Sequence, residues 1–357
     1  MQGANARALG GDQITDQVRL VRTVFPGFNR AIVGGSTTRP GGFPLGATAI
    51  VSGPTTGGKS TLIAGLARSF QMANGIAHYI DAEFALDLAW FHQLGTPLDM
   101  YVGKRQDLVK KPPPMYYEDV VREVDRAIET YAEQKTNHPD FGPMLIVVDS
   151  LKKLIPKRVA RKINREKDIR GAALGREQAG MNTEWVVSLG PKIADHEIAV
   201  IFIQHERDGE RGGHEIKGGH GIQLDATAIL RCEFASRAYD LAKAKSDDGE
   251  RVVDTRPATS KRHRVTVLKT KVGAQTFGDD SKFCFYVGTG KGLCPVGWDR
   301  PRELLEEAAF RGLVGLEWKW GMPLTSGTRF KMGRQSRTLK QLYTQPGLVD
   351  ELALMLR

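Results

Sequence analysis

Four short apolar runs constrain the fold of this 357-residue chain more than any other feature. Stretches with the period of amphipathic helices, such as STLIAGLARSFQMA and YEDVVREVDRAIETYAEQ, separate the runs. The runs are ATAIVSG, IAHYIDAEF, MLIVVDSL and IAVIFIQH, at residues 47–53, 76–84, 144–151 and 198–205. Strands of this kind alternating with helices are typical of a mainly parallel sheet with helices on both faces. The sequence therefore predicts an α/β fold.

The pattern changes after residue 230. Two longer alternating segments, RHRVTVLKTKV and SKFCFYVG, follow a charged insert at about residues 243–261 and predict antiparallel strands at the sheet edge. From about residue 301 the segments RELLEEAAFRG and LVDELALMLR predict a small helical module. We expect a short N-terminal segment, a large core and a small α-rich C-terminal domain, at residues 1–30, 31–297 and 298–357.

Composition narrows the class of protein. Apolar residues make up 41% and charged residues 26%, which favours a packed, enzyme-like body. Because no apolar run approaches the roughly 18 residues of a membrane span and no signal sequence is evident, we expect a cytoplasmic protein without membrane contact. The three cysteines lack the spacing of a zinc site, so we interpret them as small buried side chains. The net charge of +10 suggests a polyanionic partner.

The strongest motif is a phosphate-binding loop. Residues 53–60 read GPTTGGKS, which fits GxxxxGK[ST] directly after a strand and before a helix. Lys59 is expected to reach the β and γ phosphates of ATP, and the Ser60 hydroxyl to bind Mg²⁺. Asp149, at the end of the third apolar run, is the expected second ligand of that ion. The predicted loop contacts are Gly53, Pro54, Thr55, Thr56, Gly57, Gly58, Lys59, Ser60 and Thr61.

Further motifs resemble one family. The segment IDAEFALD at residues 80–87, then VVDSLKKLIPK, IFIQHER, KGGHGIQLDATAILR and VTVLKTKVGA, resemble segments of RecA-family recombinases in the same order. The last 25 residues are similar to that family's C-terminal helical module. The resemblance spans about residue 32 to the end. It implies a RecA-like P-loop ATPase core, and an ATP-dependent, Mg²⁺-dependent protein that forms a filament on single-stranded DNA and promotes homologous pairing and strand exchange with double-stranded DNA.

The resemblance also implies residue roles. Glu83 falls on the glutamate that activates the attacking water. Asp87 and Trp90 fall where the family holds adenine, although Trp90 is equally suited to be a buried core residue. Lys269 and Lys271 fall on lysines that reach the ATP of the adjacent subunit, although lysines also protect exposed edge strands. The implied assembly is a helical filament with ATP at subunit interfaces, in which the N-terminal segment contacts a neighbour. Single-strand-binding and loader proteins are further implied partners.

Departures from the family pattern matter as well. The γ-phosphate sensor, usually glutamine, falls on His205, which is similar to bacteriophage recombinases of the UvsX type; Gln204 directly before it remains an alternative sensor. Val287 falls where the family places a tyrosine near the nucleotide, with Tyr286 adjacent. If the chain is phage-encoded, we expect it in the host cytoplasm.

Two segments are predicted to bind DNA. Residues 152–170 hold nine basic residues against two acids, a pattern that suits either a DNA loop or a solvated helix face. Residues 206–219 are glycine-rich and polar, which suits sequence-independent contact with a backbone. The expected loops are 152–176 and 206–219. The predicted DNA contacts are Lys157, Arg158, Arg161, Lys162, Arg165, Arg170, Arg176, Arg207, Arg211, Ile216 and Lys217.

Two other functions remain open at this point. A RecA-fold helicase or motor shares the phosphate loop and the interfacial site, but it normally carries extra domains for ring assembly. A nucleotide-regulated filament that binds DNA without exchanging strands fits the same motifs. A branch-migration protein of the RadA type is disfavoured, because the chain lacks an N-terminal four-cysteine zinc finger.

Overall fold

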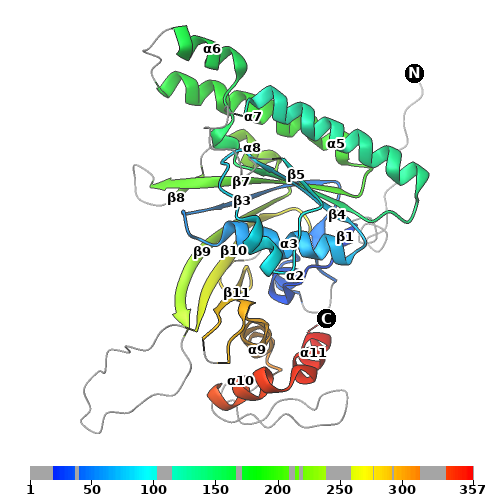
Figure 1. Ribbon diagram of the computed structural model, residues 1–357, viewed down its shortest axis with the longest axis vertical. Coiled ribbons are helices and arrows are strands. Elements are labelled where there is room, and N and C mark those ends of the chain that lie inside the picture. The colour runs from blue at the N-terminus through cyan, green and yellow to red at the C-terminus, as the bar shows by residue number, and fades with distance from the viewer. Residues whose placement is uncertain are drawn as a thin grey trace.

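The computed structural model describes residues 19–36, 40–102, 115–165, 171–208, 214–216, 220–238, 259–275, 277–291, 293–313 and 335–356. A ten-stranded mixed sheet with helices on both faces dominates it (Figure 1). The strand order is β12-β11-β10-β9-β3-β7-β6-β4-β5, with β8 paired to β7. The predicted α/β class is confirmed.

The four apolar runs form the parallel centre of the sheet. They are β3 (Ala47–Gly53), β4 (Ile76–Asp81), β6 (Met144–Asp149) and β7 (Ile198–Asp208). The short strand β5 (Met100–Val102) and β9 (Ala228–Ala238) extend the parallel part on either side. The carboxyl ends of these strands lie along one edge of the sheet, which is where ligands of such sheets bind.

Successive side chains of each strand enter two different cores. Val51, Val147 and Ile201 pack with α2 (Pro26–Ile32), α3 (Lys59–Met72) and α4 (Leu88–Gln93). Ile50 and Val200 pack with α5 (Tyr117–Asn137) and α7 (Gly171–Ile193) on the opposite face. Since both faces are covered, the strands are mostly apolar along their length and show no strict alternation of apolar and polar residues.

The antiparallel edge predicted from the later segments is also present. Strands β10 (Ser260–Thr270), β11 (Lys282–Thr289) and β12 (Val296–Trp298) continue the sheet antiparallel from β9. A separate two-stranded sheet joins β1 (Leu20–Val21) to β2 (Phe43–Pro44). Figure 1 shows β9 and β10 projecting together beyond the parallel strands.

The C-terminal helices have an apolar cluster of their own. Helices α9 (Arg300–Phe310), α10 (Gln335–Thr344) and α11 (Pro346–Met355) enclose leucines such as Leu304, Leu342 and Leu352. A buried ion pair between Arg30 Nε and Glu307 Oε1 (2.8 Å) ties α9 to α2. Because α2 also packs in the main core, the boundary expected near residue 30 falls inside this helix.

Both segments predicted as loops contain regular structure. Residues 151–153 form the short 3₁₀ helix η1 (Leu151–Lys153), and α6 (Lys157–Arg165) follows before α7 begins at Gly171. Lysine and arginine are good helix formers, which explains why a basic run is helical here. In the second segment β7 continues to Asp208 and pairs antiparallel with β8 (His214–Ile216), and α8 (His220–Asp225) follows. Among the described residues, no helix is long and apolar enough to cross a membrane.

Candidate functional site

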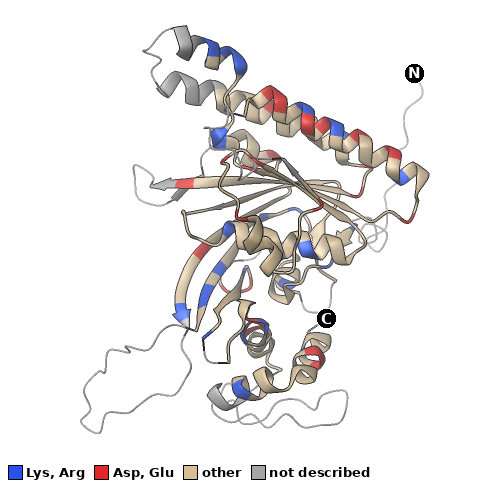
Figure 2. Cartoon of the chain, viewed as in Figure 1, with Lys and Arg blue, Asp and Glu red and all other residues tan. Residues whose placement is uncertain are grey.

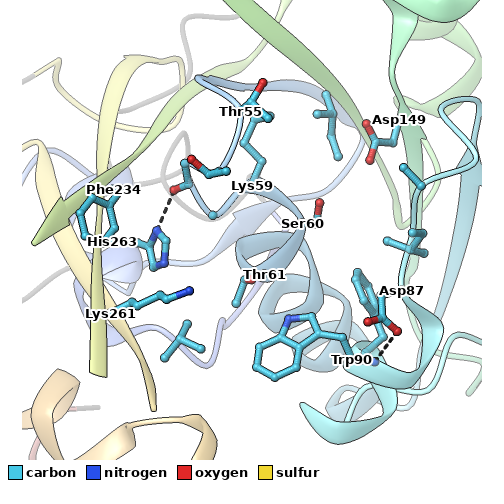
Figure 3. A pocket seen from close by; sticks show the side chains of 18 of the residues that line it. Thr55, Lys59, Ser60, Thr61, Asp87, Trp90, Asp149, Phe234, Lys261 and His263 are labelled. Carbon is cyan, nitrogen blue, oxygen red and sulfur yellow. Dashed lines mark hydrogen bonds between the residues drawn. The ribbon is translucent and has the colours of Figure 1, made fainter. Parts of the chain in front are cut away.

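A cavity of about 710 Å³ opens at the carboxyl edge of the parallel strands (Figure 3). Residues of the glycine-rich loop line it from Thr55 to Thr61, and α3 begins within this lining at Lys59. The other predicted residues that line it are Glu83, Asp87, Trp90, Asp149 and His205. The structure therefore brings into one cavity residues that lie up to 150 positions apart in the sequence.

The loop has the backbone shape that a phosphate cradle requires. Thr56 and Gly58 both have positive φ angles, 68° and 97°. The Lys59 ammonium donates to the carbonyls of Gly53 (3.0 Å) and Pro54 (2.8 Å) and so arches inside the loop. Burial lowers the pKa of this lysine, and the nearby Asp149 carboxylate partly offsets that effect. Because no side chain caps the start of α3, its first N–H groups remain available to an anion.

Asp149 has the environment of a cation ligand. The Tyr79 hydroxyl donates to its Oδ2 (2.6 Å), and burial is the main reason that its pKa is raised to about 6. A cation would relieve this cost of burying the carboxylate. Ser60, in the first turn of α3, is exposed in the same cavity. One carboxylate and one hydroxyl fit Mg²⁺ bound to nucleotide phosphates, and the described residues hold no cluster of three His, Cys, Asp or Glu side chains.

Glu83 is fixed at the cavity by its backbone and by its side chain. Its N–H donates to the Asp149 carbonyl (3.1 Å) and to Asp81 Oδ1 (3.1 Å). Its Oε1 accepts from the Ser150 hydroxyl (2.6 Å) and lies 2.9 Å from His205 Nε2. The hydrogen bond with His205 is the main reason that the pKa of Glu83 is lowered to about 2. The carboxylate is therefore ionised at neutral pH.

His205 and Gln204 lie on opposite faces of β7. His205 lines the cavity, whereas the Gln204 side chain is absent from the lining. Gln204 is fully buried, and neither its Oε1 nor its Nε2 has a hydrogen-bond partner among the residues that the structure describes. Because side chains alternate along a strand, only His205 reaches the nucleotide side. This geometry favours His205 as the sensor, but the hydrogen bond that it makes in the structure is with Glu83.

The two predicted adenine contacts lie together at the entrance to α4. Asp87 caps this helix, and its Oδ1 accepts from the backbone N–H of Trp90 (3.0 Å). The Trp90 ring lines the cavity and also packs against the main core, so both interpretations of this residue apply.

A wall of residues from β9, β10 and β11 completes the cavity, and the sequence did not predict its members apart from the remark on Val287. Phe234, Arg237, Lys261 and His263 belong to it. Arg237 and Lys261 are paired directly across β9 and β10, so their side chains lie on the same face. Neither forms an ion pair with a described residue. Alternation within RHRV indicates a shared face, but no sequence signal sets the register between β9 and β10.

Lys269 and Lys271 lie outside this cavity. Lys269 Nζ donates to the carbonyls of Gln223 (2.7 Å) and Leu224 (2.6 Å), and Lys271 Nζ donates to that of Asp225 (3.0 Å). Both therefore lie at the end of α8, and neither belongs to the lining of the cavity. Burial lowers the pKa of Lys269.

The predicted DNA-binding residues are only partly described. Arg158 and Arg161 are exposed on α6, while Lys157 is paired with Asp119 (2.5 Å). Figure 2 shows basic residues on α6 and along the β9–β10 hairpin. Lys162, Arg165, Arg176, Arg207 and Ile216 lie in helices or strands whose side chains fall outside the description; Arg170, Arg211 and Lys217 lie outside the described residues altogether.

Several known proteins are similar to this chain in sequence. Residues 11–112 match the family model described as the RecA N-terminal domain. Protein RecA of Desulforapulum autotrophicum is 28% identical over 298 residues, which span 83% of this chain and 72% of that protein. Protein RecA of Syntrophus aciditrophicus is 28% identical over 302 residues, or 83% and 73% of the two chains. Protein RecA of Thermus thermophilus is 25% identical over 317 residues, or 87% and 78%.

Proposed function

This chain belongs to the RecA family, and we propose that it is an ATP-hydrolysing recombinase that forms a filament on single-stranded DNA and promotes pairing and strand exchange. The observation that supports this most is the single cavity shared by the phosphate loop, Glu83 and Asp149. A loop for phosphates, a carboxylate for a metal ion and an ionised carboxylate beside them are the parts that hydrolysis of a nucleoside triphosphate needs.

The side chains divide the chemistry among themselves. Lys59 and the N–H groups at the start of α3 hold the phosphates. Ser60 and Asp149 would hold Mg²⁺, and the ion would supply charge neutralisation at the phosphate oxygens. Glu83 is ionised, so it can orient a water molecule and accept its proton. Asp87 and Trp90 line the same cavity, and we assign them to contact with the adenine base.

His205 connects this chemistry with the DNA-binding side. Its imidazole lies 2.9 Å from Glu83, and β7 continues from it toward the β7–β8 hairpin. A γ-phosphate would compete with Glu83 for the same imidazole, so ATP and ADP states would differ at the start of the hairpin. Such a difference is what coupling between ATP and DNA requires, because a ligand shifts an equilibrium only through differential affinity.

DNA binding is supported by charge and position. Lys152, Lys153, Arg158 and Arg161 are exposed directly after β6, the strand that ends in Asp149. We therefore assign η1, α6 and the β7–β8 hairpin to contact with the phosphates of single-stranded and double-stranded DNA, independent of sequence. Lys269 and Lys271 would reach the ATP of the next subunit, so assembly would complete each site.

Two measurements test this function. Electron microscopy with single-stranded DNA, ATP and Mg²⁺ should show helical filaments, whereas closed rings would favour a helicase. A strand-exchange assay with homologous duplex DNA should then yield heteroduplex product in the presence of ATP. Filaments without any exchange would instead identify a nucleotide-regulated DNA-binding scaffold.

A further inference from the structure

One carbonyl of the phosphate loop is held from behind by two side chains. The Gly57 oxygen lies 2.8 Å from His263 Nδ1 and 3.1 Å from Cys232 Sγ. Both residues are buried, and they come from the paired strands β10 and β9. Neither belongs to the loop motif. The carbonyl itself can only accept hydrogen bonds, so its two partners must both be donors.

The protonation of both partners agrees with this role. Burial raises the pKa of Cys232 to about 12, so its thiol keeps its proton. Burial also lowers the pKa of His263, so the ring is neutral at neutral pH and carries one proton. The contact with the Gly57 oxygen fixes that proton on Nδ1.

The direction of this carbonyl sets the direction of the next N–H. The Gly57–Gly58 peptide is trans, so its C=O and N–H point in opposite directions. With the oxygen held toward β9 and β10, the Gly58 N–H points the other way, and no described backbone group accepts from it. Gly57 and Gly58 both line the cavity. A flip of this peptide would instead turn a carbonyl oxygen toward the anionic phosphates.

The His263 ring is itself fixed by its neighbours. It stacks on Phe285, with ring centroids 5.1 Å apart and planes 14° apart, and it meets the edge of Phe234 at 5.9 Å. It also packs directly under Gly58, where a Cβ atom would lie 2.5 Å from Nδ1. Figure 3 shows this ring on β10 with its hydrogen bond to the loop. These contacts hold the ring in the orientation that directs Nδ1 toward the Gly57 oxygen.

We propose that His263 is a positioning residue for phosphate binding, which together with Cys232 holds the Gly57–Gly58 peptide with its N–H toward the nucleotide. This inference rests on the proposed function, since it takes ATP as the ligand of the cavity. Phosphate binding would then depend on residues outside the loop motif as well, because β9 and β10 supply the two hydrogen-bond donors to the Gly57 carbonyl.

The test separates the hydrogen bond from the packing of the ring. His263→Phe keeps an aromatic ring between Phe234 and Phe285 but removes the donor. His263→Asn removes the ring but keeps an amide nitrogen near the position of Nδ1. Cys232→Ala and Cys232→Ser form the matching pair for the thiol. Titration calorimetry would give the affinity of each folded variant for ATP and for adenosine, and circular dichroism would check the fold.

We expect His263→Phe to bind ATP about tenfold more weakly, equal to about 1.4 kcal/mol. Adenosine, which has no phosphate, should bind as it does to wild type, and His263→Asn should recover most of the ATP affinity. The double variant with Cys232→Ala should lose more than either single variant. Equal losses for ATP and adenosine, or His263→Asn as weak as His263→Phe, would overturn the positioning role. A wild-type chain that binds no ATP would overturn the proposed function as well, whereas unchanged ATP binding in His263→Phe would overturn only this inference.

Discussion

The contact between His205 and Glu83 predicts a measurable coupling energy. The pKa of Glu83 lies at about 2, against an ordinary value of 4.5. At 1.36 kcal/mol for each pKa unit, interactions in the fold favour the charged carboxylate by about 3 kcal/mol. The Glu83 side chain is 19% exposed, so solvent screens this only in part. The hydrogen bond with His205 is the largest cause. We therefore expect about 1.5 kcal/mol of coupling between the two side chains, within the range for a hydrogen bond to a charged group.

A double-mutant cycle in urea measures this coupling on the nucleotide-free chain. The free energy of unfolding at pH 7 is compared among wild type, His205→Ala, Glu83→Gln and the double variant. Gln204→Ala serves as the control, because Gln204 lies on the opposite face of the same strand. The change in the free energy of unfolding caused by Gln204→Ala should simply add to the change caused by Glu83→Gln, with no coupling between the two.

The coupling should also depend on pH in one direction. The pKa of Glu83 is lower in the folded chain than in the unfolded chain. The contribution of the ionised carboxylate to the stability of the fold is therefore complete above about pH 4.5 and disappears as the pH falls toward about 2. A coupling below about 0.3 kcal/mol at pH 7 lies within ordinary additivity and would refute the reasoning. A coupling that grew as the pH fell below 4.5 would contradict it too.

Three further predictions follow from the site. Lys59→Ala should abolish ATP binding and ATP-dependent DNA binding together, since its ammonium is the cation inside the phosphate loop. Calorimetry would measure the binding of ATP, and fluorescence anisotropy the binding of DNA. The double variant Arg158→Ala with Arg161→Ala should reduce the magnitude of the slope of log K for single-stranded DNA binding against log salt by about 1.4, at roughly 0.7 for each lost phosphate contact. The control variant Arg126→Ala on α5 should leave this slope unchanged. Lys261→Ala should weaken the binding of ATP and ADP equally, by about fivefold at low salt and less at high salt, because its ammonium lines the cavity and pairs with no carboxylate of the described residues.

The sequence could predict two parts of the site: the continuous phosphate-loop motif, and the residues at the carboxyl ends of the parallel strands. The phosphate loop and its flanking strand and helix occupy one continuous stretch from Ala47 to Met72, so the motif carries its own context. Glu83, Asp149 and His205 follow or end parallel strands, and the carboxyl ends of such strands always meet at one edge. Their convergence could therefore be expected before their distances were known.

The residues that the sequence missed depend on pairing between distant strands. Lys261 and His263 enter the cavity because β10 pairs with β9 in one register, and a shift by one residue would turn both side chains to the other face. The sequence could not show whether His205 or Gln204 faces the cavity. Both faces of β7 are covered, so the apolar run does not reveal which positions face α3. The basic segment after Asp149 suits either a loop or a helix face in the sequence, and α6 forms there because lysine and arginine favour helices.

The hydrolysis rate of Glu83→Gln shows most directly whether this cavity hydrolyses ATP with Glu83 as the general base. Glutamine keeps the size of the side chain but removes the carboxylate that lies beside Asp149 and Ser150 at the cavity. We expect wild type to hydrolyse ATP faster when single-stranded DNA is present. Glu83→Gln should bind ATP normally but hydrolyse it about 10²- to 10⁴-fold more slowly, the usual contribution of a general base. Near-wild-type turnover in Glu83→Gln, with Lys59→Ala inactive in the same assay, would contradict the role of Glu83 as the base.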